Sequence, residues 1–134
     1  MKCSTNTLSG GCLCGSIRYD ILGPVADIHA CHCTQCRKQS GHFVVATSAK
    51  RSDLKLHENK TLKWYKSSQF TQRGFCSECG SALFWDDGSD LVSINVGTLD
   101  QPTGLKLTKH IFVEDKADYY EIDDKLEKHS GYES

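Results

Sequence analysis

Seven of the eight cysteines in this chain fall into three short groups, and this bunching constrains the fold more than any other feature. The groups are Cys12 and Cys14; Cys31, Cys33 and Cys36; and Cys76 and Cys79, with Cys3 standing apart. A small hydrophobic core has no need of such spacing. A metal ion does, because ligands that are close in sequence reach one ion with little loss of chain entropy. The sequence therefore predicts metal binding.

The sizes of the three groups divide the ligands between two sites. A closed structural zinc takes four thiolate or imidazole ligands, and the two pairs together supply four. The group of three leaves one position open, as in catalytic zinc sites. A pair combined with the triple would give five ligands and leave the other pair without a metal. We therefore expect a structural zinc at Cys12, Cys14, Cys76 and Cys79, and a second zinc, held more loosely and able to leave its site empty, at Cys31, Cys33 and Cys36.

Other uses of the cysteines compete with an open zinc site. A disulfide framework is typical of secreted chains, but residues 1–11 are polar and lack the apolar stretch of a signal peptide, so we expect a reducing, cytoplasmic location. Cys76 and Cys79 have the spacing of a redox pair, which requires a βαβ context that the pattern does not predict. A third alternative stays open: His29 or His32 can complete the three-cysteine group, which would make it purely structural.

The size and charge of the chain limit the classes of partner. Its 134 residues suit a single domain, residues 1–134. The 16 basic and 17 acidic residues give a net charge of −1, which offers no electrostatic reason to expect nucleic acid or an acidic membrane as a partner. No apolar run approaches the roughly 18 residues of a membrane span. The oligomeric state is not indicated.

Short alternating patterns separated by turn residues predict a mainly β protein with little helix. The third cysteine group, Cys76-Ser77-Glu78-Cys79-Gly80, lies between two expected strands and predicts a zinc knuckle at the tip of a hairpin. A single helical turn is expected at residues 34–39, ended by Gly41, which would bring Cys36 back towards Cys33. The strands are expected at residues 16–22, 25–30, 42–49, 62–65, 70–75, 82–85, 91–96, 105–113 and 119–122.

Four parts of the chain carry a recognisable pattern. They are Gly11-Cys12-Leu13-Cys14-Gly15, Cys31-His32-Cys33-Thr34-Gln35-Cys36-Arg37, Arg73-Gly74-Phe75-Cys76-Ser77-Glu78-Cys79-Gly80, and His110-Ile111-Phe112-Val113 with Lys116-Ala117-Asp118. Together they resemble the glutathione-dependent formaldehyde-activating enzyme family. The resemblance implies a β-tent fold of small antiparallel sheets around a structural zinc. It also implies the same division of the cysteines into a four-ligand and a three-ligand zinc site.

The resemblance further implies a zinc-dependent carbon–sulfur lyase similar to S-(hydroxymethyl)glutathione synthase. Such an enzyme joins a small-molecule thiol such as glutathione to formaldehyde or another small aldehyde as an S-hydroxymethyl adduct, and also reverses the reaction. A free thiol has a pKa of about 8.5 and is mostly protonated at neutral pH. An open zinc would bind it as the thiolate, which is the nucleophile. Cys31, Cys33 and Cys36 would then be the catalytic residues.

Glutathione would also need cationic side chains for its carboxylates. Arg37, Lys38 and Arg73 are the candidates nearest the motifs, and arginine offers a bidentate fit. The competing hypothesis is a non-enzymatic zinc-binding module, structural or for interaction, in which both metals are structural. A histidine as fourth ligand of the three-cysteine group would favour the module, and an open coordination position would favour the enzyme.

Overall fold

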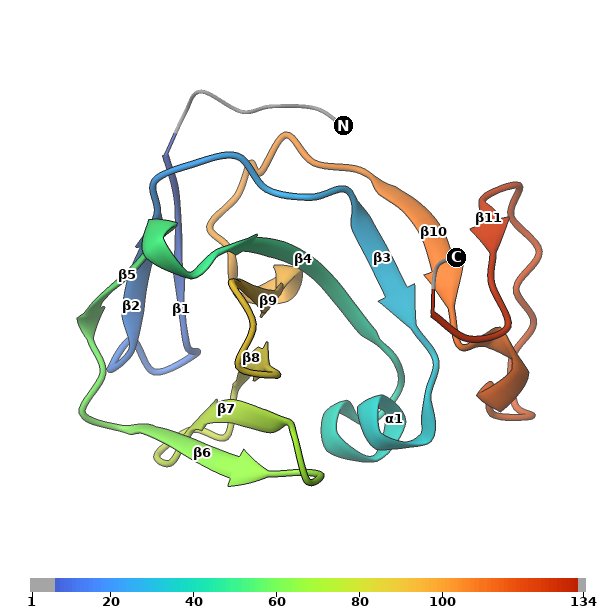
Figure 1. Ribbon diagram of the computed structural model, residues 1–134, viewed down its shortest axis with the longest axis horizontal. Coiled ribbons are helices and arrows are strands. Elements are labelled where there is room, and N and C mark those ends of the chain that lie inside the picture. The colour runs from blue at the N-terminus through green and yellow to red at the C-terminus, as the bar shows by residue number, and fades with distance from the viewer. Residues whose placement is uncertain (1–6, 133–134) are drawn as a thin grey trace.

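The computed structural model describes residues 7–132, in which the β-strands form two sheets joined by turns and loops (Figure 1). Cys3 lies outside the described residues. The smaller sheet is antiparallel, with three strands in the order β1-β2-β5. Its strands are β1 (Leu8–Gly11), β2 (Arg18–Ile21) and β5 (Leu54–Glu58).

The larger sheet has eight strands in the order β11-β10-β3-β4-β9-β8-β7-β6. Most neighbours are antiparallel, but β10 runs parallel to both β3 and β11, a pairing that the sequence did not indicate. The strands are β3 (Ile28–Cys31), β4 (Val44–Lys50), β6 (Leu62–Lys66), β7 (Gln72–Cys76), β8 (Ala82–Asp86), β9 (Leu91–Asn95), β10 (Leu107–Ile111) and β11 (Glu127–Lys128).

Helix is scarce in the described part of the chain. The one α-helix is α1 (Thr34–Ser40), and the 3-10 helices are η1 (Arg51–Asp53), η2 (Val96–Thr98) and η3 (Val113–Asp115). The predicted mainly β class is therefore confirmed. No helix among residues 7–132 is long and apolar enough to span a membrane.

The α1 helix lies between β7 and β3, near both ends of the larger sheet (Figure 1). It begins after Cys33, whose sulfur accepts a hydrogen bond from the Cys36 amide at 3.3 Å. It ends at Gly41, where φ is 96° and the amide donates to the Arg37 carbonyl at 2.8 Å. A left-handed residue at this position favours glycine. The predicted helical turn and its glycine end are both confirmed.

One expected strand is absent. Residues 119–122 form no strand, and the two-residue strand β11 follows them instead. The hydroxyl of Tyr119 bonds the His42 ring at 2.7 Å, and the hydroxyl of Tyr120 bonds the His32 ring. These aromatic residues have a high strand propensity, but their side-chain contacts hold the segment without a backbone ladder. The prediction of a strand at this position was wrong.

The main hydrophobic core joins the two sheets. Tyr19 and Ile21 of the smaller sheet and Leu83 and Ile94 of the larger sheet are fully buried in it. The Tyr19 ring meets the Phe84 ring edge-on, with 5.3 Å between ring centroids. A second, smaller cluster lies beside α1 and consists of Cys31, Cys36, Val44, Ala46 and Ile111. The second cluster is therefore built around two of the cysteines.

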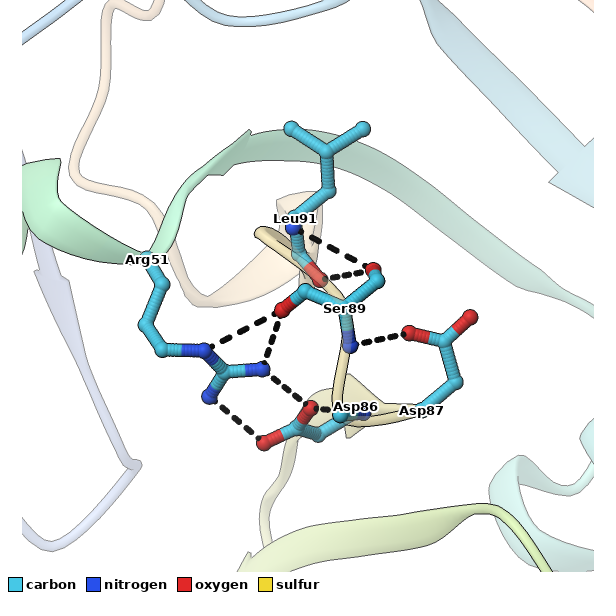
Figure 2. A network of polar contacts seen from close by, with 6 residues as sticks. Arg51, Asp86, Asp87, Ser89 and Leu91 are labelled. Atoms are coloured by element: carbon cyan, nitrogen blue, oxygen red, sulfur yellow. Dashed lines mark hydrogen bonds and ion pairs between the residues drawn. The ribbon is translucent and has the colours of Figure 1, made fainter.

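An ion pair ties η1 to the end of β8 and the turn that follows it (Figure 2). Arg51 donates from Nη1 to Asp86 Oδ2 at 2.9 Å and from Nη2 to Asp86 Oδ1 at 2.7 Å. Its Nη2 also donates to the Ser89 carbonyl at 2.6 Å. The guanidinium holds the pKa of the Asp86 carboxyl below its usual range. This contact holds the turn between β8 and β9 against η1, the segment that joins β4 of the larger sheet to β5 of the smaller sheet.

Candidate metal centres

Four cysteine sulfurs meet where the β1–β2 turn approaches the β7–β8 turn. Cys12 and Cys14 come from the first turn, and Cys76 and Cys79 from the second; all four sulfurs lie within 4.8 Å of one another. Cys14 Sγ is 3.6 Å from Cys12 Sγ and 3.8 Å from Cys76 Sγ. A regular tetrahedron with zinc–sulfur bonds of about 2.3 Å places its sulfurs about 3.8 Å apart. The spacing therefore fits a four-coordinate zinc.

Hydrogen-bond donors surround these four sulfurs. Ser16 Oγ lies 3.1 Å from Cys14 Sγ and 3.4 Å from Cys76 Sγ, and the Cys79 amide donates to Cys76 Sγ at 3.4 Å. Desolvation opposes ionisation of Cys76, but its hydrogen bonds with the Ser16 and Thr61 hydroxyls and with backbone amides outweigh this effect and lower the pKa of the thiol to about 5. Such donors favour the thiolate, which is the form that binds a metal.

The other three sulfurs come from a single short segment. Cys31 ends β3, Cys33 is the N-cap of α1, and Cys36 lies in the first turn of that helix. Their sulfurs also lie within 4.8 Å of one another. Hydrogen bonds from the Cys31 and Cys36 thiols lower the pKa of Cys33. All seven cysteines in the described residues are free thiols, which fits two metal sites and not a disulfide framework.

The side chain of His32 turns away from the three sulfurs. Its Nδ1 bonds the Tyr120 hydroxyl, and its Nε2 pairs with His110 Nδ1 at 2.9 Å. His110 Nε2 in turn pairs with Asp124 Oδ2 at 2.8 Å. Burial, and then the neighbouring His110, lower the pKa of His32 to about 4. Both ring nitrogens of His32 are engaged, so His32 does not complete the ligand set.

His29 lines the same cavity as the three sulfurs, but its ring does not join their mutually close group. Within residues 7–132, no histidine, aspartate, glutamate or further cysteine brings a ligand atom within 4.8 Å of all three sulfurs. The described chain therefore offers three ligands here, against four at the other cluster.

The three cysteines line a cavity of about 560 Å³. The wall is formed by α1 and by strands of the larger sheet, and it includes the polar side chains of Gln35, Asn95 and Lys109 and the aromatic rings of Trp85 and Tyr132. Small-molecule sites typically have volumes of about 300–1,000 Å³ and combine an apolar wall with a few polar groups. None of the other four cysteines lines this cavity. It is therefore a candidate substrate site that belongs to the three-cysteine cluster alone.

The three cations expected to bind substrate occupy different places. Arg73 lines the cavity, is only 5% exposed and donates from Nη1 and from Nη2 to Cys36 Sγ, each at 3.7 Å. Arg37 and Lys38 lie in the last turn of α1 and do not line the cavity. The structure therefore brings one of the three together with the cysteines.

Both clusters fit the metal that their residue types suggest. Thiolates are the preferred ligands of structural zinc, and the sulfur spacing at the four-cysteine site matches its tetrahedral geometry. The three-cysteine cluster offers the same type of ligand, but one ligand fewer than the four-cysteine cluster. Metal binding at both clusters is consistent with zinc.

Several residues that organise these sites were not anticipated from the sequence. Ser16 lies among the sulfurs of the four-cysteine cluster. His110 and Tyr120 bond the His32 ring, and Asp124 bonds His110. Ser16 is adjacent to the first motif, and His110 lies in a segment that carries the family resemblance. Tyr120 has no local signal, because its partner His32 is 88 residues away, and Asp124 lies in a polar segment outside the motifs.

Residues 7–115 match the model of the protein family described as glutathione-dependent formaldehyde-activating enzyme. The chain belongs to this family. The membership confirms the resemblance inferred from the cysteine motifs. The matched region includes both cysteine clusters but ends before Tyr120 and Asp124.

Two relatives agree with the family assignment. An uncharacterised lyase from Schizosaccharomyces pombe is 27% identical over 118 residues, which cover 87% of this chain and 85% of that protein. A protein from Halomonas elongata, whose name places it provisionally among the glutathione-dependent formaldehyde-activating enzymes, is 27% identical over 129 residues, covering 88% of this chain and 82% of that protein.

A crystal structure of a Rhodobacter sphaeroides protein has a similar fold. It superposes with a TM-score of 0.61 and 24% sequence identity, covering 72% of this chain and 91% of that one. At this level of identity the likeness supports the fold alone.

Proposed function

We propose that this chain is a zinc-dependent carbon–sulfur lyase that joins a small-molecule thiol such as glutathione to formaldehyde or another small aldehyde, and that catalyses the reverse reaction. The observation that carries the proposal is the three-sulfur cluster in the wall of a cavity, with no fourth ligand from the described residues. This arrangement leaves room for a substrate atom beside the sulfurs. The family membership supports the choice of a thiol and an aldehyde as reactants.

The chemistry needs a thiolate at neutral pH. Zinc held by Cys31, Cys33 and Cys36 would supply it, because a thiol bound at an open zinc position loses its proton. The substrate sulfur then attacks the carbonyl carbon and a carbon–sulfur bond forms. The carbonyl electron pair moves to the oxygen, which takes up a proton. In reverse, the hydroxyl loses its proton, the carbon–sulfur bond breaks, and the aldehyde leaves.

The cavity would bind and orient the two reactants. Trp85 and Phe112 contribute apolar wall, which limits the access of water to the reacting sulfur. Lys109 of β10 lines the cavity as well and adds a cation to the candidates for a substrate carboxylate. Arg37 and Lys38 remain candidates for the part of a longer substrate that extends beyond the cavity. Arg73, in contrast, donates to a cysteine sulfur.

The competing proposal is a zinc-binding module in which both metals are structural. Such a module would be expected to close both sites with four ligands. The three-ligand cluster at a cavity therefore favours the enzyme.

The proposal is tested by the rate at which a thiol and formaldehyde exchange with their S-hydroxymethyl adduct. Two-dimensional exchange NMR with ¹³C-formaldehyde and glutathione measures this rate at equilibrium, where the uncatalysed reaction sets the background. The zinc-loaded protein should raise the exchange rate, and Cys36→Ser should return it to the background. Cys3→Ser is the matched control, because Cys3 lies outside the three groups, and it should leave the rate unchanged.

A second thiol in the same experiment addresses the substrate. 2-Mercaptoethanol carries the reacting sulfur without the carboxylates of glutathione. Acceleration with either thiol supports the lyase, and the ratio of the two rates measures the contribution of the carboxylates. No acceleration with either thiol, in protein shown to contain zinc at both sites, would contradict the proposal.

A further inference from the structure

Arg73 is a buried cation without a carboxylate partner in the described part of the chain. Its side chain extends from the middle of β7, and the residue is 5% exposed. Within residues 7–132, the ion pairs involve other arginines, lysines and histidines, and none involves Arg73. Its Nε has no hydrogen-bond partner there either. A buried charge is costly unless a counter-charge lies beside it, so the partner of Arg73 must be sought among other groups.

The group that can carry this counter-charge is a cysteine sulfur. Nη1 and Nη2 of Arg73 each donate to Cys36 Sγ at 3.7 Å, and Nη2 also donates to Gln35 Oε1 at 3.3 Å. Gln35 is neutral, whereas Cys36 is negative when it serves as a metal ligand. The planar fork of the guanidinium allows both terminal nitrogens to face one sulfur. Arg73 therefore behaves as the counter-ion of the three-cysteine cluster.

The charge of the cluster indicates what such a counter-ion does. Three thiolates and one Zn²⁺ sum to −1, and a fourth thiolate makes the sum −2, whereas a neutral fourth ligand leaves it at −1. A second negative charge in a partly buried site is unfavourable, and a cation in contact with one of the sulfurs reduces that penalty. A cation at this point should have little effect on the binding of a neutral ligand.

We propose that Arg73 selects an anionic fourth ligand, a thiolate, at the three-cysteine site by offsetting the negative charge that this ligand adds. This role rests on the proposed function, because it presumes an open coordination position. It differs from the role expected from the sequence, which was contact with a carboxylate of the substrate. Arg73 acts on the bound sulfur through Cys36 and is a positioning residue in this sense.

The test compares an anionic and a neutral ligand in the same proteins. Zinc is replaced by Co²⁺, whose visible absorption changes when its ligands change. 2-Mercaptoethanol, which binds as the thiolate, and imidazole, which binds as the neutral ring, are each titrated into the wild-type protein. Because a closed four-cysteine site has no position for an added ligand, the spectral change reports the three-cysteine site.

Arg73→Gln removes the charge and keeps much of the side chain. We expect it to weaken 2-mercaptoethanol binding about tenfold or more, the size of one charge-assisted hydrogen bond, and to change imidazole binding less than about twofold. Arg73→Lys keeps the charge, so the ratio of the two affinities should stay within about threefold of the wild-type ratio. Arg51→Gln removes one positive charge from a side chain that does not line the cavity and is the control, for which neither affinity should change.

The outcomes separate the role of Arg73 from the proposed function. If Arg73→Gln weakens both ligands equally, the charge has no selective role and the inference fails, while the open site stands. If the wild-type protein binds neither ligand, the open position is absent, and the proposed function fails together with the inference. If Arg73→Gln does not fold, Arg73→Lys decides alone. Loss of the wild-type ratio of 2-mercaptoethanol to imidazole affinity in this charge-conserving variant contradicts the inference. Retention of that ratio supports it.

Discussion

The two cysteine clusters use the same ligand atoms in opposite ways. The four-cysteine cluster joins turns that are distant in sequence, since Cys14 and Cys76 are 62 residues apart, and hydroxyl and amide donors surround its sulfurs. The three-cysteine cluster comes from residues 31–36 alone and faces a cavity and a buried arginine. A metal that links distant turns restricts the unfolded chain, whereas one held within a single turn restricts it very little. We therefore propose that the first cluster supports the fold and the second supports the chemistry.

The strongest test of this difference between the clusters is to remove one cysteine from each of them. Cys79→Ser leaves the long-range zinc site incomplete. Structural zinc contributes about 10–16 kcal/mol in zinc-finger peptides, which is as large as the whole stability of a typical domain, about 5–15 kcal/mol. We therefore expect this variant to be unfolded or to lose most of its unfolding free energy, as measured by thermal and denaturant melts followed by circular dichroism.

Cys36→Ser is the matched substitution at the other cluster. It removes a local ligand and places a hydroxyl in a buried position, so we expect a loss of about 1–3 kcal/mol with the fold retained. Equal losses in the two variants would contradict the division into a structural and a functional site.

Chelation of the wild-type protein should show the same difference as an order of release. A chelator of graded concentration should remove one metal first, from the three-ligand cluster, with little change in circular dichroism. The second metal should leave only at higher chelator concentration, together with loss of the fold. Metal content and circular dichroism, measured on the same samples, check this. Loss of both metals in a single step, accompanied by unfolding, would show that the clusters do not differ in this way.

A substitution that leaves all seven cysteines in place should have a smaller effect, and a different one on metal release from each cluster. Tyr120→Phe removes the hydroxyl that bonds His32, which lies between Cys31 and Cys33, and leaves a buried ring nitrogen without this partner. The expected cost is about 1–3 kcal/mol. Metal should then leave the three-cysteine cluster at lower chelator concentration, with the second phase of release shifted less.

The neighbouring Tyr119→Phe is the control for this substitution. Tyr119 makes the corresponding bond to His42, which is exposed and can bond water instead. Its removal should cost less than about 0.5 kcal/mol. If both tyrosine variants release metal at the same chelator concentration as the wild type, the bond between Tyr120 and His32 has no part in holding the three-cysteine segment.

A contact that belongs to neither cluster should affect stability without affecting metal release. Arg51→Gln removes the bidentate partner of Asp86, and because the Arg51 side chain is 47% exposed we expect a loss of only about 1 kcal/mol at pH 7. The folded-state pKa of Asp86 is depressed, so this stability is present above the ordinary carboxyl pKa and is lost as the pH falls through the lowered value. Denaturant melts from pH 7 to pH 2 should show the two proteins converging in acid, with metal release unchanged at pH 7. A difference that grows in acid would contradict this account.

The sequence predicted which cysteines lie together, because local spacing determines much of this grouping. Cys31, Cys33 and Cys36 are brought together by one helical turn, which begins and ends close to where the turn residues indicated. The knuckle at Cys76 and Cys79 follows in the same way from two flanking strands and a short turn. Dividing the cysteines by counting required no long-range geometry, and the two clusters fall where the count placed them.

The cavity could not be predicted in the same way, because its wall is assembled from both halves of the larger sheet. Lys109 reaches it only through the parallel pairing of β10 with β3, and Arg73 only because β7 faces α1. The error at residues 119–122 has a similar origin: contacts with histidines about 80 residues away override a local strand propensity. Pairings over such distances leave no periodic trace in the sequence.

Strand β7 has a consequence for the order in which the molecule is completed. It carries Cys76 at its end and Arg73 three residues earlier, so the two lie only about 10 Å apart along one extended backbone. Zinc bound at the knuckle would anchor the strand that presents the guanidinium to the other cluster. A newly made chain should therefore acquire its knuckle zinc first, and the second cluster should mature only afterwards. In a cell short of zinc, such a chain would accumulate as a folded, singly loaded form that is inactive but ready to be switched on by one further ion.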